Sequence, residues 1–291
     1  MNTLKEISAV MSPEISSLID GLPSHVTEEI EEIRLRCGQK IQLRCGSRER
    51  MINHVVEYEE LKKILNRLLQ FSYYAYEEDL AKGFITIQGG HRIGICGRTV
   101  SKKGEAGVIR EVSSVNVRFA KEVKGCSSKV LPKIFKGRTL LNTLIISPPG
   151  CGKTTLLRDI ARALSEYRMN VAICDERTEI AGMHNGKASF DLGPRCDVLD
   201  GCLKSEGLPI LIRAMAPDVI ITDEIGMKED ISPIMQCLTS GVKLITSVHG
   251  NSMEDLEKSS VSHLVDNHVF ECLVFLSNER GVGTVREIQY V

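Results

Sequence analysis

The stretch from Leu144 to Thr155, with the sequence LIISPPGCGKTT, decides the fold. It follows the phosphate-binding pattern G-x-x-x-x-G-K-[ST], except that Ser147 stands at the position of the first glycine. That glycine only turns the chain away from the end of a strand, and a small serine can take its place. Apolar residues precede the loop as in a strand and follow it at helical spacing, which is the context that the motif requires. The stretch therefore predicts a phosphate-binding loop.

Each part of this loop has an expected task at a bound nucleotide. Backbone N–H groups released by glycine wrap the phosphates at the N-terminus of a helix. The Lys153 ammonium is expected at the β- and γ-phosphates, and the Thr154 hydroxyl at Mg²⁺. The predicted nucleotide-binding residues are Pro149, Gly150, Cys151, Gly152, Lys153, Thr154 and Thr155.

A second apolar run ends in two carboxylates. Residues 217–224 have the sequence PDVIITDE, which predicts a buried strand followed by Asp223 and Glu224. We expect Asp223 to hold the Mg²⁺ shell, and Glu224 to orient or deprotonate the water that attacks the γ-phosphate. The sequence contains no N/T-K-x-D motif, which reads guanine, so ATP is the expected nucleotide.

The second half of the chain alternates short apolar runs with helical patterns. This alternation predicts a parallel sheet with helices on both faces. Strands are expected at 144–147, 171–174, 219–222 and 243–248, helices around 156–164, 210–215 and 231–238, and an antiparallel edge hairpin at 269–276 and 284–291. Pro209 is expected to open the second of these helices.

The first half predicts a smaller α+β domain. The expected elements are paired strands at 32–35 and 40–43, a helix at 61–69, and a hairpin of strands 84–87 and 92–96 around Gly89 and Gly90. The predicted fold class is therefore α/β, a P-loop NTPase core with a mainly parallel sheet behind a small α+β domain. We expect the α+β domain at 1–125, a linker at 126–137 and the ATPase domain at 138–291.

Composition excludes several classes of protein. The 291 residues are 42% hydrophobic and carry a net charge of -1, which indicates an ordinary globular protein without overall attraction to nucleic acid or anionic membrane. The ten cysteines include no C-x-x-C pair, which argues against a disulfide scaffold and a zinc site. No secretory leader and no apolar run of roughly 18 residues is present. A cytoplasmic protein is expected.

Two further blocks carry a resemblance to a known class. Residues 175–179, DERTE, follow the second expected strand, and residues 247–250, SVHG, end the strand at 243–248. With the two nucleotide motifs, this order resembles the secretion and pilus-retraction ATPases of the RecA-like class. In that class the corresponding blocks are called the Asp box and the His box. The resemblance implies a RecA-like core, with Glu179 as a second catalytic carboxylate and His249 as a γ-phosphate sensor or interface residue. DERTE departs from the usual E-D-P-x-E, so the division of work stays open among Asp175, Glu179 and Glu224.

Longer strings are more specific. Residues 75–80 (AYEEDL), 83–98 (GFITIQGGHRIGICGR), 115–118 (VNVR) and 193–207 (GPRCDVLDGCLKSEG) are similar to the stage III sporulation protein AA family of endospore-forming bacteria. The resemblance spans nearly the whole chain. It implies a mother-cell ATPase that forms a homohexamer and powers or assembles the channel joining mother cell and forespore. It also implies a membrane-anchored partner, and hence a cytoplasmic protein peripheral to the forespore membrane.

Arginine is expected to complete the site, because RecA-like hexamers usually recruit one from a neighbouring subunit or from the N-terminal domain. The candidates are Arg92, Arg98, Arg118 and Arg195. The stretch 92–138 holds twelve basic residues, which fit a subunit interface near the nucleotides, a solvated face, or a surface for nucleic acid or anionic lipid. Few aromatic residues interleave, which weakens the case for a base-stacking platform.

Together these residues predict a Mg²⁺-dependent ATPase whose hydrolysis does mechanical work on a protein partner. Glu224 or Glu179 is expected to position the water, while Lys153 and an arginine stabilise the developing charge. A RecA-type nucleic-acid-stimulated ATPase is an alternative. A regulatory module that binds ATP but barely hydrolyses it is another, and the carboxylates argue against it.

Overall fold

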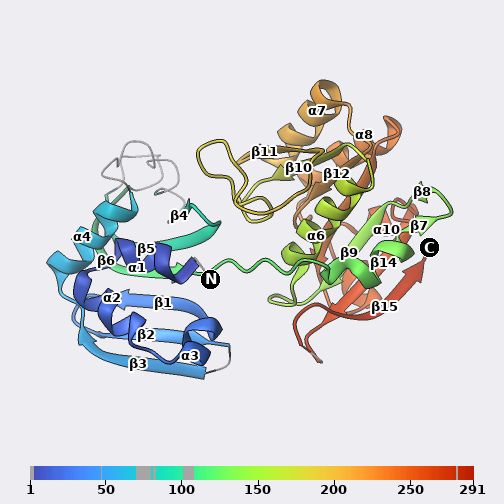
Figure 1. Cartoon of the computed structure of the whole chain (residues 1–291). Coiled ribbons are helices and arrows are strands. Elements are labelled where there is room, and N and C mark those ends of the chain that lie inside the picture. The colour runs from blue at the N-terminus through green and yellow to red at the C-terminus, as the bar shows by residue number, and fades with distance from the viewer. Residues whose placement is uncertain (1–2, 47, 70–79, 81–82, 101–107, 280) are drawn as a thin grey trace. The chain divides into compact units, whose positions relative to one another are not determined.

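The chain divides into two compact units, Met1–Ala120 and Lys121–Val291. The computed structural model describes residues 3–46, 48–69, 80, 83–100, 108–279 and 281–291, drawn in colour in Figure 1. The division precedes the expected end of the first domain at 125, and residues 126–137 lie in the second unit. There Val130 and Ile134 are buried in the core, because two short helical turns carry them onto it.

The first unit is an antiparallel sheet whose strands run in the order β3-β2-β1-β6-β5-β4. The strands are β1 Ile30–Arg36, β2 Lys40–Cys45, β3 Arg48–Val55, β4 Phe84–Ile87, β5 His91–Val100 and β6 Val108–Arg118. The helices are α1 Thr3–Val10, α2 Pro13–Asp20, α3 Ser24–Glu29 and α4 Tyr58–Leu68. The expected strand pair, helix and hairpin are confirmed by β1–β2, α4 and β4–β5. Residues 75–79 of the AYEEDL string lie outside the described residues.

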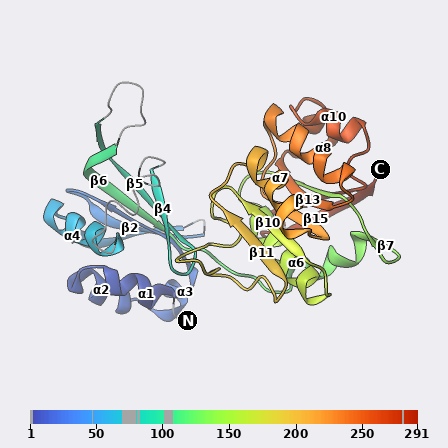
Figure 2. The same ribbon diagram turned by 90° about the horizontal axis from the view of Figure 1, so that it is seen from above.

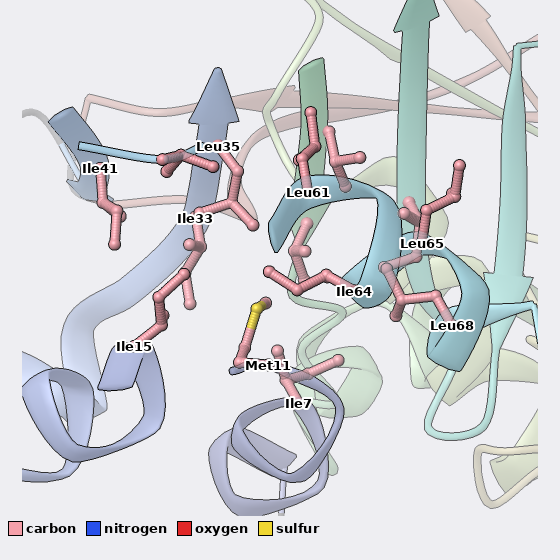
Figure 3. Close-up of a cluster of buried hydrophobic side chains, with 14 of the residues drawn as sticks. Ile7, Met11, Ile15, Ile33, Leu35, Ile41, Leu61, Ile64, Leu65 and Leu68 are labelled. Atoms are coloured by element: carbon pink, nitrogen blue, oxygen red, sulfur yellow. The ribbon is translucent and has the colours of Figure 1, made fainter. Parts of the chain in front are cut away.

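The core of the first unit lies between helices and one face of the sheet. Strand residues alternate between the two faces, so Ile33 and Leu35 of β1 both point to the helices. The helical spacing of Leu61, Ile64 and Leu65 puts these side chains on one stripe of α4. Figure 3 shows this cluster, which is completed by Ile7 of α1, Ile15 of α2 and Met11 between these two helices.

The opposite face of this sheet is polar. The strand register brings Arg92 of β5 opposite Arg118 of β6, and Arg118 opposite Glu32 of β1. The buried Glu32 carboxylate pairs with Arg34 Nη2 at 2.8 Å and with Arg118 Nε at 3.4 Å. The Arg92 guanidinium lies 3.6 Å from the ring centre of Phe84. This face therefore presents arginines, of which two share one carboxylate.

The second unit contains a seven-stranded sheet in the order β11-β10-β12-β13-β9-β14-β15. The strands are β9 Thr143–Ser147, β10 Val171–Asp175, β11 Cys196–Asp200, β12 Val219–Thr222, β13 Lys243–His249, β14 Cys272–Ser277 and β15 Thr284–Tyr290. All neighbours pair in parallel except the β14–β15 hairpin at one edge. The helices are α6 Lys153–Glu166, α7 Lys204–Met215, α8 Ile231–Thr239, α9 Met253–Glu257 and α10 Ser262–Asp266. The predicted mainly parallel sheet and its edge hairpin are thus confirmed.

Helices cover both faces of this sheet, as expected. Figure 2 shows α6 on one side of the strands and α7 and α8 on the other. Along β9, Ile145 packs into the cluster that contains α6, whereas Leu144 and Ile146 pack into the cluster of α7 and α8. The inner strands β9, β10, β12 and β14 are therefore buried on both faces, which explains why they are nearly continuous apolar runs without polar alternation.

The start of α7 differs from the sequence prediction. The helix begins at Lys204 and holds Pro209 inside it, although Pro209 was expected to open it. The first turn forms before the proline is reached, because the N–H groups of Glu206 and Gly207 donate to the Leu203 carbonyl oxygen at 3.0 and 2.8 Å. Gly207 lets this turn approach β10, since an added Cβ would lie 2.6 Å from Cys174 Sγ. Tertiary packing therefore outweighs the hydrogen bond that proline cannot donate.

Asp159 fastens the first turn of the second unit to α6. Its carboxylate accepts hydrogen bonds from Gly125 N–H (3.0 Å), Ser127 N–H (2.8 Å) and Ser127 Oγ (2.7 Å), and it pairs with Arg162 at 2.7 Å. Burial alone would raise the pKa of Asp159, but these hydrogen bonds lower it from 3.8 to about 2. The ionised carboxylate therefore stabilises the folded state.

We predict that Asp159→Asn lowers the free energy of unfolding by about 2 kcal/mol at pH 7. Because the pKa is depressed in the folded protein, this stabilisation is complete above the ordinary value of 3.8 and is lost as the pH falls toward 2. Urea unfolding of both proteins between pH 7 and pH 3 measures the difference. The exposed Asp197→Asn is the control, and a pH-independent deficit in Asp159→Asn would contradict the prediction.

Candidate active site

The predicted phosphate-binding loop joins β9 to α6. Gly150 and Gly152 have φ angles of +75° and +85°, in the left-handed region that favours glycine. Gly152 is the N-cap of α6, so the first N–H groups of that helix face the loop. The Cys151 side chain is buried in the core of the second unit, so this residue offers only its backbone to a ligand.

Lys153 lies at the first position of α6, and its ammonium is held inside the site. Its Nζ donates to the Ser147 carbonyl oxygen at 3.0 Å and to His249 Nδ1 at 2.6 Å. Burial lowers the pKa of Lys153, while the charges of Glu224 and Asp223 oppose that shift. Because an ammonium group only donates, His249 Nδ1 is the acceptor, and the proton of the neutral ring lies on Nε2.

Asp223 and Thr154 lie together, as expected for residues that share a magnesium ion. Thr154 Oγ1 donates to Asp223 Oδ2 at 3.0 Å. The other carboxylate oxygen accepts from Ser247 Oγ at 3.0 Å and from the N–H of Glu224 at 2.9 Å. Ser247, which the sequence analysis did not single out, thus orients Asp223 from the neighbouring β13.

The donor set of Thr154 and Asp223 fits Mg²⁺, which prefers oxygen ligands and takes only one or two carboxylates beside phosphates and water. Across the described parts of the chain, no three His, Cys, Asp or Glu side chains gather as a self-sufficient metal cage.

Glu224 is paired through both carboxylate oxygens. His249 Nε2 lies 2.9 Å from Oε1, and Arg177 Nη1 lies 3.3 Å from Oε2. Together with the Lys153–His249 contact, these pairs form a chain of donors and acceptors from α6 to the loop after β10. Arg177 was not among the predicted site residues, although it lies within the DERTE block.

The DERTE block forms a loop organised by Asp175. This carboxylate is fully buried and accepts from the N–H groups of Glu179 (2.9 Å), Ile180 (3.0 Å) and Ala181 (2.8 Å). Burial raises the pKa of Asp175 to about 6 despite these hydrogen bonds. Among the three carboxylates left open by the sequence, Asp175 therefore has a structural task in the loop that carries Glu179.

Arg158 of α6 binds the backbone of the same loop. The guanidinium donates to the carbonyl oxygens of Ile180 (2.7 Å), Glu179 (2.7 Å) and Lys121 (2.9 Å), and lies 3.5 Å from the ring centre of Phe190. Burial lowers the pKa of Arg158 to about 10. The sequence analysis missed this residue, because its position in the apolar helix pattern carries no sign of its partners.

The arginine candidates have separate surroundings. Arg92, Arg98 and Arg118 belong to the first unit; Arg98 pairs with Glu111 at 3.5 Å, and the other two lie on the polar sheet face described above. Arg195 donates to the Ser165 carbonyl oxygen at 3.3 Å, near the end of α6 that is remote from the phosphate loop. Within one chain, Arg195 therefore does not reach the Lys153 network.

The tip of the β14–β15 hairpin touches the phosphate loop. Gly283 N–H donates to the Cys151 carbonyl oxygen at 3.0 Å. A Cβ added to Gly152 would lie 3.0 Å from Val282 Cγ1, whereas one added to Gly150 would meet no atom within 4 Å. The edge hairpin thus restricts one of the two loop glycines.

The chain is similar in sequence to known proteins along its whole length. A family model described as "Sporulation stage III, protein AA" matches residues 1–290. The chain is 39% identical over 291 residues to stage III sporulation protein AA of Bacillus subtilis (strain 168), covering 98% of this chain and 94% of the relative.

Two solved structures share the fold. The pilus retraction motor PilT with bound ADP has a TM-score of 0.61 at 13% identity, covering 91% of this chain and 80% of its own. The Legionella pneumophila ATPase DotB has a TM-score of 0.59 at 16% identity, covering 91% and 76%. The predicted RecA-like fold of secretion ATPases is therefore confirmed. None of the helices in the described residues is both long and apolar enough to cross a membrane.

The two loop glycines provide a matched pair of substitutions. Both Gly150→Ala and Gly152→Ala put a side chain at positive φ, which costs roughly 1–3 kcal/mol. We expect Gly152→Ala to destabilise more, because its Cβ also meets Val282. The double variant Gly152→Ala/Val282→Ala should recover the excess. Thermal unfolding measures all three, and equal losses in the single variants would contradict a restraining role for the hairpin.

Proposed function

The chain belongs to the stage III sporulation protein AA family, and on that premise we propose that it is a Mg²⁺-dependent ATPase that powers or assembles a secretion-like channel between mother cell and forespore. One observation carries the proposal. Lys153, His249 and Glu224 are joined by contacts of 2.6 Å and 2.9 Å, with the Thr154–Asp223 pair alongside them. A lysine, a hydroxyl and two carboxylates at a phosphate-binding loop are what ATP hydrolysis needs.

In the proposed reaction, water attacks the γ-phosphate in line with the leaving ADP oxygen. The loop N–H groups and Lys153 bind the phosphates and stabilise the charge that develops. Thr154 and Asp223 would hold Mg²⁺, which neutralises phosphate oxygens when bound. Glu224 is the proposed water-positioning carboxylate, because it is tied to His249 and therefore to the lysine. Glu179 is the alternative, held on the neighbouring loop by Asp175 and Arg158.

We further propose a homohexamer in which Arg92, Arg98 or Arg118 completes the site, with His249 sensing the γ-phosphate through Lys153. Arg98 and Arg118 are exposed on strands of the first unit, and Arg92 is half-exposed beside Phe84, which supports the choice of these residues. The protein would act in the mother-cell cytoplasm and dock on a membrane-anchored channel protein.

A nucleic-acid-stimulated ATPase is a second candidate, because the polar sheet face of the first unit carries several arginines. Glu32 neutralises part of that charge, and Phe84 is covered by Arg92 instead of being open for stacking. Salt-sensitive DNA binding that raises ATP turnover would support this alternative.

The first test is the ATPase rate as a function of protein concentration, with light scattering alongside and Lys153→Ala as the blank. If sites are completed between subunits, the activity per chain should climb steeply as larger assemblies form. Constant activity per chain would show that one chain holds a complete site. No turnover at any concentration, with or without DNA, would contradict the proposed function.

Glu224→Gln separates binding from chemistry. The amide keeps the shape of the side chain but cannot take a proton from water, so we expect ATP binding to persist while turnover falls at least about 100-fold. Equilibrium binding of ATP and steady-state phosphate release measure the two effects. Unchanged turnover would reassign the water-positioning task to Glu179, for which Glu179→Gln is the matched test.

A further inference from the structure

Arg177 contacts the proposed water-positioning carboxylate although no motif assigns it a task. Its Nη1 lies 3.3 Å from Glu224 Oε2, and its side chain is 54% exposed. It comes from the loop that follows β10, and Glu224 comes from the loop that follows β12, the parallel neighbour of β10. The carboxyl ends of the two strands thus bring an arginine and an acid together at the edge where nucleotides bind in α/β sheets.

The loop on which Arg177 lies is fixed on both sides of it. Before it, the Glu176 carboxylate pairs with Lys204 Nζ at 2.6 Å, and Lys204 is 7% exposed. After it, Thr178 has a φ of +56°, unusual for a β-branched residue, and Asp175 holds the next N–H groups. The backbone of Arg177 is therefore set by its neighbours, while its guanidinium stays free to exchange partners.

We propose that Arg177 is the arginine that this chain supplies to its own site. With the site empty, Arg177 pairs with Oε2 of Glu224. When the γ-phosphate enters, the guanidinium leaves Glu224 for the phosphate oxygens, and the freed carboxylate oxygen accepts the attacking water. No covalent bond changes in this exchange. The inference rests on the proposed ATPase function and extends it.

The exchange is energetically easy. An ion pair with this exposure contributes little to stability, so little is lost when Arg177 leaves Glu224. A phosphate offers more negative charge than a carboxylate, and the planar guanidinium can bind two of its oxygens. His249 remains on Oε1, so Glu224 keeps its orientation after Arg177 has moved.

The exchange also makes the access of water to Glu224 depend on the bound nucleotide. Both oxygens of Glu224 accept from donors in the empty state, so neither is open to a water molecule. Entry of the γ-phosphate removes one donor and frees one carboxylate oxygen at the place where the attacking water must be held. A merely structural ion pair would not link these two events.

The test compares Arg177→Ala and Arg177→Lys with the control Arg213→Ala, an exposed arginine of α7 that bonds its own helix at Pro209. For Arg177→Ala we expect kcat to fall at least about 100-fold, with ADP affinity changed less than about threefold. Arg177→Lys should recover little, because lysine cannot bind two oxygens at once. Trapping of ADP with aluminium fluoride, which mimics the transferring phosphoryl group, should be lost in both variants. The urea unfolding midpoints should match the wild type.

The outcomes separate this inference from the proposed function. If the wild type hydrolyses ATP and Arg177→Ala retains kcat within about twofold, the cis arginine is refuted and the ATPase stands. If Arg177→Ala fails to bind ADP, or unfolds early as Arg213→Ala does not, the residue is structural and the inference is wrong. If the wild type neither hydrolyses ATP nor traps ADP with aluminium fluoride, both proposals are overturned.

Discussion

The register between β9 and β13 is the constraint on which the site depends. It pairs Ser147 with His249, the residues that end the two strands. Both of these residues offer an acceptor to Lys153, one through a carbonyl oxygen and the other through Nδ1. A slip of one residue would turn His249 to the opposite face of the sheet and separate the lysine from Glu224. The polar chain of the site is thus built on a backbone pairing that apolar residues enforce, since Ile145 and Ile146 bury one face each.

Helix α6 joins the phosphate loop to two other segments. Its first residue carries the Lys153 ammonium, and one turn later Arg158 and Asp159 bind backbone groups of segments that are distant in the chain. Arg158 holds the carbonyl oxygens of the DERTE loop, and Asp159 holds the N–H groups of Gly125 and Ser127, shortly after the end of the first unit. Both side chains are almost fully buried. Because buried charges are costly unless their hydrogen bonds are complete, these three segments are bound to one helix as a single body.

The sequence predicts what local pattern determines. The phosphate loop, the strand before Asp223 and the edge hairpin were all predicted from the sequence. Each combines a buried apolar run with neighbouring residues that are typical of one local structure. The prediction that Pro209 opens α7 was wrong, because the first turn of this helix forms before the proline and packs against β10 at Gly207. Arg158, Arg177 and Ser247 were missed for another reason. Each is defined by a partner far away in the sequence, and nothing in its own neighbourhood distinguishes it from a helical, exposed or strand residue.

The charges at the site explain why the proposed ATPase reaction would require both a divalent cation and an arginine. Asp223 and Glu224 follow β12 directly, so an incoming triphosphate meets two carboxylates as well as the Lys153 ammonium. Lysine alone cannot balance that repulsion, least of all when burial disfavours its charged form. Oxygen ligands at Thr154 and Asp223 allow a divalent ion to turn one carboxylate from a repulsive neighbour into a ligand. The other carboxylate, Glu224, is the proposed water-positioning group, and in the empty site His249 and Arg177 already pair with its two oxygens. In the proposed function, nucleotide binding would therefore redistribute existing partners among a few fixed groups, a small rearrangement that repeated turnover can reverse.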